Sequence, residues 1–254
     1  MINFKLITSF FIMFCCVTLL FITLELLSSW WLILCLVLGC TVLITASFNM
    51  GWQVFLKSFT HKKTTKKVIA LTFDDGPHPE FTPKVLALLK QYDAKATFFC
   101  IGKHIEKHPE LLKAIADAGH AIGNHSYTHS NTIGFKNKRE WIAEIERTDA
   151  IIKQITAGKT KLFRPPFGVT TPHLSSALKT TNHVCVGWNI RTFDTFFKSP
   201  KIISKRIIKR ITPGAIILLH DKQENCIPVL EHILHTLQSE HYAMVTIKAL
   251  CYEK

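Results

Sequence analysis

The sequence predicts an α/β fold of parallel strands joined by helices, preceded by two hydrophobic helices long enough to cross a membrane. Two observations lead to this prediction. After residue 67, short apolar runs alternate with amphipathic segments about seven times, and before residue 57 two long stretches contain no charged residue. Such alternation builds either an open doubly wound sheet or a closed barrel, and a count of about seven strands slightly favours the barrel.

The uncharged stretches lie between Lys5 and Glu25 and between Glu25 and Lys57. Each is long enough to span the roughly 30 Å of bilayer hydrocarbon as a helix. A cleaved signal peptide is the alternative for the first stretch, but no small-x-small cleavage site follows it. We therefore expect residues 1–56 to form a retained anchor of two transmembrane helices, and the protein to be an integral, multi-pass membrane protein in contact with lipids.

The net charge of +13 lies outside these stretches, and part of it is concentrated in residues 57–67, which we expect to form a basic linker. A lysine cluster beside a membrane indicates contact with anionic headgroups and is typical of a cytoplasmic flank. Nucleic acid is not expected as a partner, because the basic residues show neither a recognition motif nor interleaved aromatic residues.

The strands are predicted from short apolar runs bounded by turn residues. We expect them at Val68–Asp74, Lys95–Ile101, His120–His125, Lys161–Pro166, His183–Ile190, Ala215–His220 and Ala243–Ile247.

Helix starts are predicted from capping residues. In three places a hydroxyl side chain precedes a proline, which is favoured at the first helical position, and one Asn–Glu pair resembles a capping box. Pro109 opens a further helix, which Gly119 ends. The predicted cap pairs are Thr82–Pro83, Thr171–Pro172, Ser199–Pro200 and Asn137–Glu140.

Two adjacent carboxylates, Asp74 and Asp75, end the first predicted strand immediately before Gly76 and Pro77. They repel each other if both side chains reach one pocket, and a divalent cation would offset that repulsion. Taken alone, this Asp-Asp-Gly-Pro segment is more often an ordinary turn. Its interpretation therefore depends on what the other strand ends carry.

His125 and His129 follow the third predicted strand. Four residues apart, they would lie on one side of a helical turn, with about 5–6 Å between their Cβ atoms. By itself this spacing is weak evidence in a chain with 13 histidines. Together with one carboxylate, the two imidazoles form a set of three metal ligands that leaves positions open for water and substrate.

Three later segments also place polar residues at predicted strand ends. The Arg164 segment contains paired prolines, which stiffen the loop and free a backbone amide, and His220 ends an apolar strand. In parallel α/β folds, active sites are built at the C-terminal edge of the sheet. The segments are Phe163–Gly168, Trp188–Thr195 and Ile216–Asp221.

Together these residues resemble the polysaccharide deacetylase family (NodB homology domain, carbohydrate esterase family 4), whose members remove acetyl groups from sugars. The resemblance covers about Val68 to Leu250, and its five motifs occur in the family's order. It implies a distorted parallel (β/α) barrel over residues 68–254, with a groove open to a polymer. It also implies removal of acetyl groups from an N-acetylated glycan, such as peptidoglycan or a chitooligosaccharide.

The resemblance assigns roles residue by residue. Asp74 is the expected general base, and His220 is the general acid that protonates the departing amine. Asp75, His125 and His129 are the expected ligands of a divalent metal ion, with zinc the first choice.

The remaining motif residues are expected to support these groups. By the same resemblance Arg164 tethers Asp74, and Asp194 orients His220. The backbone amide of Phe167 would stabilise the oxyanion, and Trp188 would either form an apolar wall for a sugar ring or belong to the core. The segment departs from the family pattern at Arg191, which stands where relatives have an acidic residue.

Some alternatives stay open at this point. A metallohydrolase of another amide on a small or lipid-linked precursor fits the same residues, whereas a catalytically silent carbohydrate-binding protein is disfavoured because Asp74 and His220 are both present. For His78 a surface turn is favoured over a place in the site, and His104 is expected to be solvated on a helix.

The side of the membrane is open as well. Two spans place both termini on one side, and the lysines favour the cytoplasm, whereas most members of the family act on extracellular glycans. Either the positive-inside signal is overridden, or one segment does not span, or the substrate is a cytoplasmic lipid-linked precursor.

Overall fold

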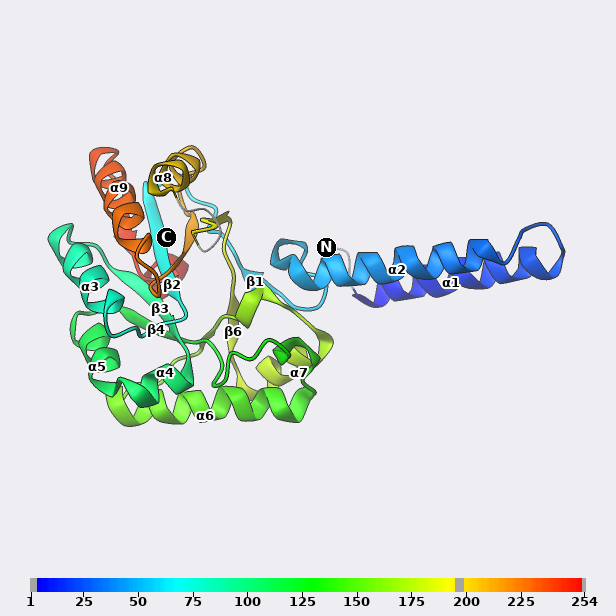
Figure 1. The fold of residues 1–254 in the computed structure, drawn as a ribbon, viewed down its shortest axis with the longest axis horizontal. Coiled ribbons are helices and arrows are strands. Elements are labelled where there is room, and N and C mark those ends of the chain that lie inside the picture. Colours follow the sequence, from blue (N-terminus) through cyan, green and yellow to red (C-terminus); the bar gives the residue numbers. More distant parts are fainter. Residues whose placement is uncertain (1–3, 195–198, 253–254) are drawn as a thin grey trace.

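The computed structural model describes residues 4–194 and 199–252, which form a helical hairpin and an α/β domain (Figure 1). The hairpin consists of α1 (Phe4–Thr23) and α2 (Trp30–Phe48) and projects from the domain. Within it, Leu6–Thr23 and Trp30–Phe48 have mean hydropathies of 2.5 and 2.4, and only 6% and 11% of their residues are buried. By length and composition, both helices can therefore cross a membrane.

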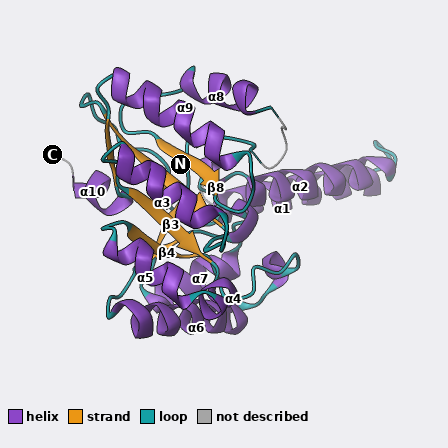
Figure 2. Ribbon diagram, turned by 60° about the vertical axis from the view of Figure 1, so that its left-hand side comes forward, coloured by secondary structure: helices purple, strands orange, loops and turns teal. Residues whose placement is uncertain are grey.

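In the described part of the chain, nine parallel strands form one sheet that curls into an incomplete barrel, with helices packed around it (Figures 1 and 2). The strand order is β1-β6-β5-β4-β3-β2-β8-β7, and β9 pairs with the beginning of β2. The predicted distorted (β/α) barrel is thus confirmed. The strands are β1 (Ser58–Phe59), β2 (Val68–Asp74), β3 (Ala96–Cys100), β4 (Ala121–Asn124), β5 (Leu162–Phe163), β6 (Val184–Val186), β7 (Ile190–Arg191), β8 (Ile216–His220) and β9 (Ala243–Val245).

Most helices of the domain begin where the sequence predicted them. The Asn137–Glu140 capping box and the Thr171 cap are confirmed, since their side chains accept hydrogen bonds from the first-turn amides. The α-helices are α3 (Phe81–Gln91), α4 (Gly102–Lys107), α5 (Pro109–Asp117), α6 (Lys138–Thr156), α7 (Pro172–Thr181), α8 (Pro200–Ile208), α9 (Cys226–Ser239) and α10 (Ile247–Tyr252), and the 3-10 turns are η1 (Met50–Trp52), η2 (Ile133–Phe135) and η3 (Pro166–Gly168).

Two of the predicted caps are wrong. Ser199 precedes α8 but makes no capping hydrogen bond with its side chain. Thr82 lies inside α3 rather than ahead of it, and its hydroxyl donates a hydrogen bond to the Asp221 carboxylate. A partner far away in the sequence therefore uses the hydroxyl that local capping rules would have employed.

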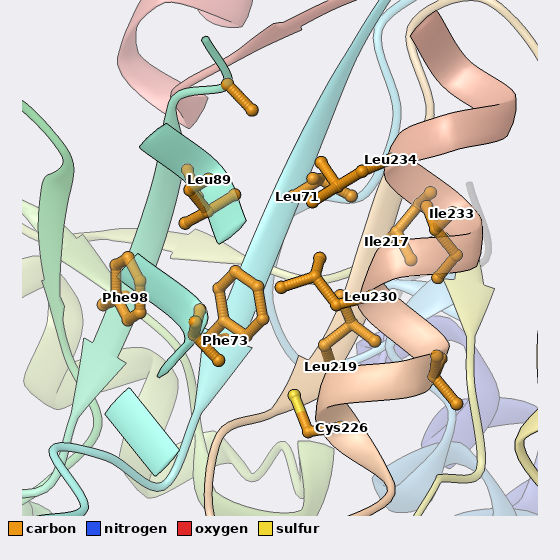
Figure 3. Close-up of a cluster of buried hydrophobic side chains, with 14 of the residues drawn as sticks. Leu71, Phe73, Leu89, Phe98, Ile217, Leu219, Cys226, Leu230, Ile233 and Leu234 are labelled. Atoms are coloured by element: carbon orange, nitrogen blue, oxygen red, sulfur yellow. The ribbon is translucent and has the colours of Figure 1, made fainter. Parts of the chain in front are cut away.

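The main core lies between the outer face of the sheet and helices α3 and α9 (Figure 3). Alternate side chains of β2 point outward, and Phe73 stacks on Phe98 of β3 with ring centroids 4.9 Å apart. Because the strands are covered on both faces, all seven residues of β2 are buried. The labelled residues of Figure 3 are Leu71, Phe73, Leu89, Phe98, Ile217, Leu219, Cys226, Leu230, Ile233 and Leu234.

The other alternate residues of β2 face the inside of the barrel. Ala70 belongs to a cluster that α10 completes at the N-terminal end of the strands. Thr72 donates a hydrogen bond to Ile217 O at 2.7 Å, so the interior is partly polar. By this alternation Asp74 also faces the interior, at the C-terminal end.

The strands near the basic segment, residues 57–67, differ from those that the sequence predicted. Residues His183–Ile190 form two strands rather than one, because β6 ends at Val186 and the chain leaves the sheet through Trp188 before β7. Within the segment expected to be a linker, Ser58 and Phe59 form β1 and pair with β6. The segment therefore begins at the edge of the sheet and then reaches the start of β8, where His61 bridges Ala215.

The hairpin is attached directly to the domain near its base. The carbonyl of Ser47, in the last turn of α2, accepts hydrogen bonds from Thr170 N–H at 2.8 Å and from Thr170 Oγ1 at 3.3 Å. Met50 follows α2 and packs in a core cluster with Phe163 and Leu174. The end of the hairpin is thus part of the folded domain.

Gly214 is predicted to be intolerant of a side chain, because its φ is +79° and an added Cβ would lie 1.8 Å from Lys62 O. We expect Gly214→Ala to destabilise the protein by at least about 1–3 kcal/mol, equivalent to several degrees in Tm. Gly158→Ala is the matched control, because its Cβ would meet nothing closer than 3.4 Å. Equal thermal denaturation midpoints for the two variants would contradict the prediction.

Candidate active site

The two neighbouring carboxylates reach the same pocket because the backbone changes conformation between them. Asp74 is the last residue of β2, whereas Asp75 has a φ of 76° and lies beyond the strand. This left-handed conformation reverses the alternation that would have sent Asp75 to the opposite face. A hydrogen bond of 2.7 Å between His104 Nδ1 and Asp75 O supports it.

The segment from His125 to His129 is not helical, so the expected helical turn is wrong. Ser126 and His129 have φ values of 65° and 48°, and the segment forms a tight loop after β4. Glu144, on α6, accepts hydrogen bonds of 2.7 Å from both N–H and Oγ1 of Thr128. These bonds hold a loop in which the two imidazole centroids lie 4.9 Å apart.

Asp75, His125 and His129 form a group suited to a metal ion. Asp75 Oδ1 lies 3.5 Å from His125 Nε2 and 3.2 Å from His129 Nε2, and the candidate ligand atoms are all within 4.8 Å of one another. A tetrahedral ion with bonds of 2.0–2.1 Å separates its ligand atoms by about 3.3 Å. The donor atoms thus fit a small divalent ion such as Zn²⁺.

The protonation states of these side chains also suit a metal ion. His125 Nδ1 donates to Arg164 O at 2.7 Å, which leaves the Nε2 lone pair facing the group. Burial and the neighbouring His125 lower the pKa of His129 to about 4, so this imidazole is neutral at pH 7. Burial raises the pKa of Asp75, but its hydrogen bond and electrostatic interaction with His125, followed by the electrostatic interactions with His129 and His220, bring this pKa well below its usual range.

Arg164, directly after β5, holds one oxygen of Asp74. Its side chain is fully buried, and Nη1 donates to Asp74 Oδ1 at 2.7 Å and to Thr72 Oγ1 at 2.8 Å. Burial lowers the pKa of Arg164, and the opposing charge of Asp74 counteracts that effect. Asp74 Oδ2 is left on the other side, 3.8 Å from His125 Nε2.

His220 lies beside the base candidate, because Asp74 of β2 and His220 of β8 are register partners. The Asp194 carboxylate accepts hydrogen bonds from the His220 backbone N–H, at 2.9 Å, and from His220 Nδ1, at 2.8 Å. Burial lowers the pKa of His220, but the hydrogen bond and charge of Asp194 outweigh it and raise the pKa above 6.5. The structure therefore places a histidine that favours its protonated form next to a carboxylate.

The loop after β5 continues into η3, where Phe167 has a φ of 58°. The hydrogen bonds of this turn are donated by the next two N–H groups, from Gly168 to Pro165 O and from Val169 to Pro166 O. The Phe167 ring lies against the imidazole of His129, with centroids 4.7 Å apart, and remains 45% exposed. The Phe167 side chain therefore packs beside one of the metal-ligand candidates.

Trp188 is partly buried between β6 and β7 and packs against two of the core clusters. The tip of its ring lies so close to Gly168 that a Cβ there would approach it to 2.6 Å. Arg191 lies over the rings of Trp188 and Phe193 at 5.8 and 4.9 Å. The end of this motif, at Thr195, lies outside the described residues.

Several residues that the sequence did not point to support the site. His104 was expected to be solvated, which is wrong because it bonds to Asp75 O. Lys222 Nζ lies 2.6 Å from Asp75 Oδ2, which leaves Oδ1 for a metal ion. Asp221 is fully buried against Gly76, and burial raises its pKa to about 7. Their partners are distant in sequence, so no local pattern identifies them.

His78, in contrast, serves the turn at the start of α3. Its Nδ1 accepts hydrogen bonds from Glu80 N–H at 3.2 Å and Phe81 N–H at 3.4 Å. The role in a turn that we favoured for His78 from the sequence agrees with this geometry.

The chain resembles known proteins in sequence. Residues 61–186 match a family model described as polysaccharide deacetylase. A peptidoglycan-N-acetylglucosamine deacetylase of Bacillus cereus is 35% identical over 189 residues, covering 73% of this chain and 68% of that protein. A peptidoglycan-N-acetylmuramic acid deacetylase of Bacillus subtilis is 34% identical over 185 residues, covering 73% of this chain but only 39% of that longer protein.

Solved structures show the same fold. A peptidoglycan N-acetylglucosamine deacetylase in complex with an N-oxidanyl-benzamide has a TM-score of 0.72 and 34% identity, covering 76% of this chain and 91% of that one. A family 4 carbohydrate esterase pseudoenzyme from Bacillus anthracis has a TM-score of 0.70 and 28% identity, covering 75% and 67%. Because active and inactive proteins share this fold, the side chains must carry the argument for activity.

We predict that Asp75, His125 and His129 bind one divalent ion per chain. Replacing either histidine by Ala removes one of three ligands, so metal content measured by elemental mass spectrometry is expected to fall at least about tenfold. His78→Ala is the matched control and should retain its metal, because His78 bonds to backbone amides in a turn. Undiminished metal in the His125→Ala protein would remove that residue from the ligand set.

Proposed function

The chain belongs to the polysaccharide deacetylase family, hydrolases that act on carbon–nitrogen bonds other than peptide bonds, and from this premise we propose that it is a membrane-anchored, metal-dependent deacetylase of N-acetylated sugars in peptidoglycan. The observation that carries the proposal is the convergence of the base, metal-ligand and acid candidates at one edge of the sheet. The peptidoglycan relatives support the choice of glycan.

Asp75, His125 and His129 would hold the metal ion, and two imidazoles with one carboxylate favour Zn²⁺. When bound, the ion supplies Lewis acidity, which makes a water molecule more acidic and polarises the acetyl carbonyl. Lys222 holds the second oxygen of Asp75 and thereby fixes which oxygen faces the ion. His125 is held in its ligand orientation by its bond to Arg164 O.

Asp74 acts as the general base through Oδ2, since Oδ1 is held by Arg164. The carboxylate accepts a proton from the attacking water, whose oxygen forms a bond to the acetyl carbon. The Phe167 N–H then donates to the developing oxyanion. The fixed guanidinium orients Asp74 without competing for the oxygen that takes the proton.

His220 acts as the general acid through Nε2, because Nδ1 is bonded to Asp194. Its proton goes to the sugar nitrogen as the carbon–nitrogen bond breaks, so that acetate and a free amine are released. Asp194 serves this step by orienting the ring and by favouring its protonated form. Base and acid thus lie on neighbouring strands, on the same side of the sheet.

The anchoring part of the proposal is that both α1 and α2 cross the membrane as a retained hairpin. Both are long and apolar enough, and few of their described side chains are buried within the protein. The N-terminus and the domain then lie on the same side of the membrane. Covalent labelling of α1 and α2 by a lipid-borne photoprobe tests this proposal, and the absence of label from either helix would contradict it.

We predict acetate release by the full chain from peptidoglycan and from N-acetylglucosamine oligomers, abolished by chelation and restored by zinc. Asp74→Asn is expected to lower kcat by about 10²–10⁴-fold while metal content stays unchanged, because it removes the base but no ligand. An active Asp74→Asn enzyme would refute the assignment of the base. A folded, metal-loaded chain that releases no acetate would instead favour another amide substrate or a silent binding protein.

We also predict the pH dependence of the acid step. His220 must be protonated to act, so activity is lost as the pH rises through its raised pKa. Asp194→Asn removes the charge that raises this pKa, and the alkaline limb of the kcat/KM profile is expected to move to lower pH by about 1 unit. Glu224→Gln, which removes an exposed acidic charge from the loop after β8, controls for a general charge effect. An unmoved alkaline limb in Asp194→Asn would show that His220 is not the acid.

A further inference from the structure

The turn before α6 displays an unusually exposed aromatic side chain. Phe135 is 91% exposed, the largest value among the exposed large hydrophobic residues of the described ranges 4–194 and 199–252. The turn itself is well anchored, because neighbouring Ile133 is fully buried and Phe135 N–H bonds to Thr132 O at 3.0 Å. The hydrogen-bonded turn therefore holds the Phe135 side chain in solvent. Contact of this side chain with an apolar partner would remove its apolar surface from water.

This turn adjoins the base of the hairpin. Gly134 packs against Val169, since a Cβ on Gly134 would lie 3.1 Å from Val169 Cγ1. The next residue, Thr170, is bonded through N–H and Oγ1 to Ser47 O at the end of α2. The exposed phenylalanine is thus linked by short contacts to the point where the second apolar helix ends.

Cationic side chains follow Phe135 in the chain, and others lie beside the base of the hairpin. Lys138 and Arg139 follow Phe135 and are exposed in the first turn of α6. Lys57 and Lys179 line a pocket together with Phe55, whose ring is 5.1 Å from that of Phe4 at the start of α1.

Acidic groups nearby are engaged elsewhere. Glu140 bonds to the backbone of Asn137 in the capping box, and Glu144 accepts a salt bridge of 3.3 Å from Lys136. The surface near the turn thus combines an apolar side chain with two cations, Lys138 and Arg139, that form no salt bridge among the described residues. That chemistry suits the interface of an anionic bilayer.

We propose that the turn Ile133–Arg139 is a second membrane contact, in which Phe135 enters the interfacial layer of an anionic lipid surface and Lys138 and Arg139 bind headgroups. The proposal rests on the membrane anchoring proposed above. It gives a role to an exposed aromatic side chain on a hydrogen-bonded turn that contacts the loop joined to the end of α2. It also gives the Pro166–Thr170 loop, which carries the oxyanion amide, a fixed position close to the bilayer.

The test is lipid photolabelling of the full chain in vesicles of phosphatidylcholine and phosphatidylglycerol that contain a phosphatidylcholine with a diazirine in its acyl chain. Mass spectrometry should find label on α1, α2 and residues 133–139. In Phe135→Ser, label on the turn is expected to fall about tenfold, because the side chain no longer enters the interface. Label on α1 and α2 should stay unchanged. Ile202→Ser, an exposed aliphatic residue on α8, is the matched control and should change nothing.

A second experiment tests how much the cationic side chains contribute to binding of the turn to the membrane. Labelling of the turn should fall in vesicles without phosphatidylglycerol, and it should also fall in a variant that carries both Lys138→Gln and Arg139→Gln. The expected reduction is about fivefold for each charge interaction that is lost. Label on α1 and α2 with none on the turn would overturn this inference alone, whereas unlabelled helices would overturn the anchoring itself. Equal turn labelling in wild type and Phe135→Ser would also overturn the inference.

Discussion

The arrangement of the site depends on one buried cation, the guanidinium of Arg164. It donates to Asp74 and Thr72 on β2 and to the carbonyls of Val186 and Gly187 at the end of β6. Leaving a buried guanidinium without its partners costs several kcal/mol, so all of these contacts must form together. The carbonyl of Arg164 in turn orients His125. Base and metal-ligand candidates are thereby positioned by one residue.

Around this centre, the loops adopt conformations that a free chain would avoid. Asp75, Ser126, His129 and Phe167 all have positive φ, each at a cost of roughly 1–3 kcal/mol. Contacts from elsewhere in the fold stabilise two of these loops: His104 bonds to the carbonyl of Asp75, and Glu144 holds the histidine loop. The free-energy cost of orienting these side chains is therefore offset when the protein folds, and the candidate site is preorganised.

The hairpin and the site are also physically connected. Ser47 at the end of α2 bonds to Thr170, three residues after the Phe167 amide, and Met50 lies close to Gly168 and Gly187. Direct contacts of this kind limit how the domain can rotate relative to the hairpin. For an enzyme proposed to act on a polymer near a membrane, such a connection would determine which face of the domain the glycan meets.

Much of this protein is determined by its sequence alone. Hydrophobic periodicity located β2 from Val68 to Asp74, and local capping located α6 and α7. The apolar runs also placed Asp74, Asp75, His125 and His220 at or directly after strand ends, and the resemblance to the family supplied their expected roles. These features depend on neighbours within a few residues or on motif identity.

Only the tertiary structure decided how the loops are shaped and what supports them. The histidine loop is not helical because Glu144 replaces its local hydrogen bonds, and Thr82 is not a cap because Asp221 takes its hydroxyl. The roles of His104 and Lys222 likewise appear only once distant strands meet. A hydrogen-bonding group takes the best partner the folded chain offers, and when that partner is far away in the sequence, no local pattern reveals it.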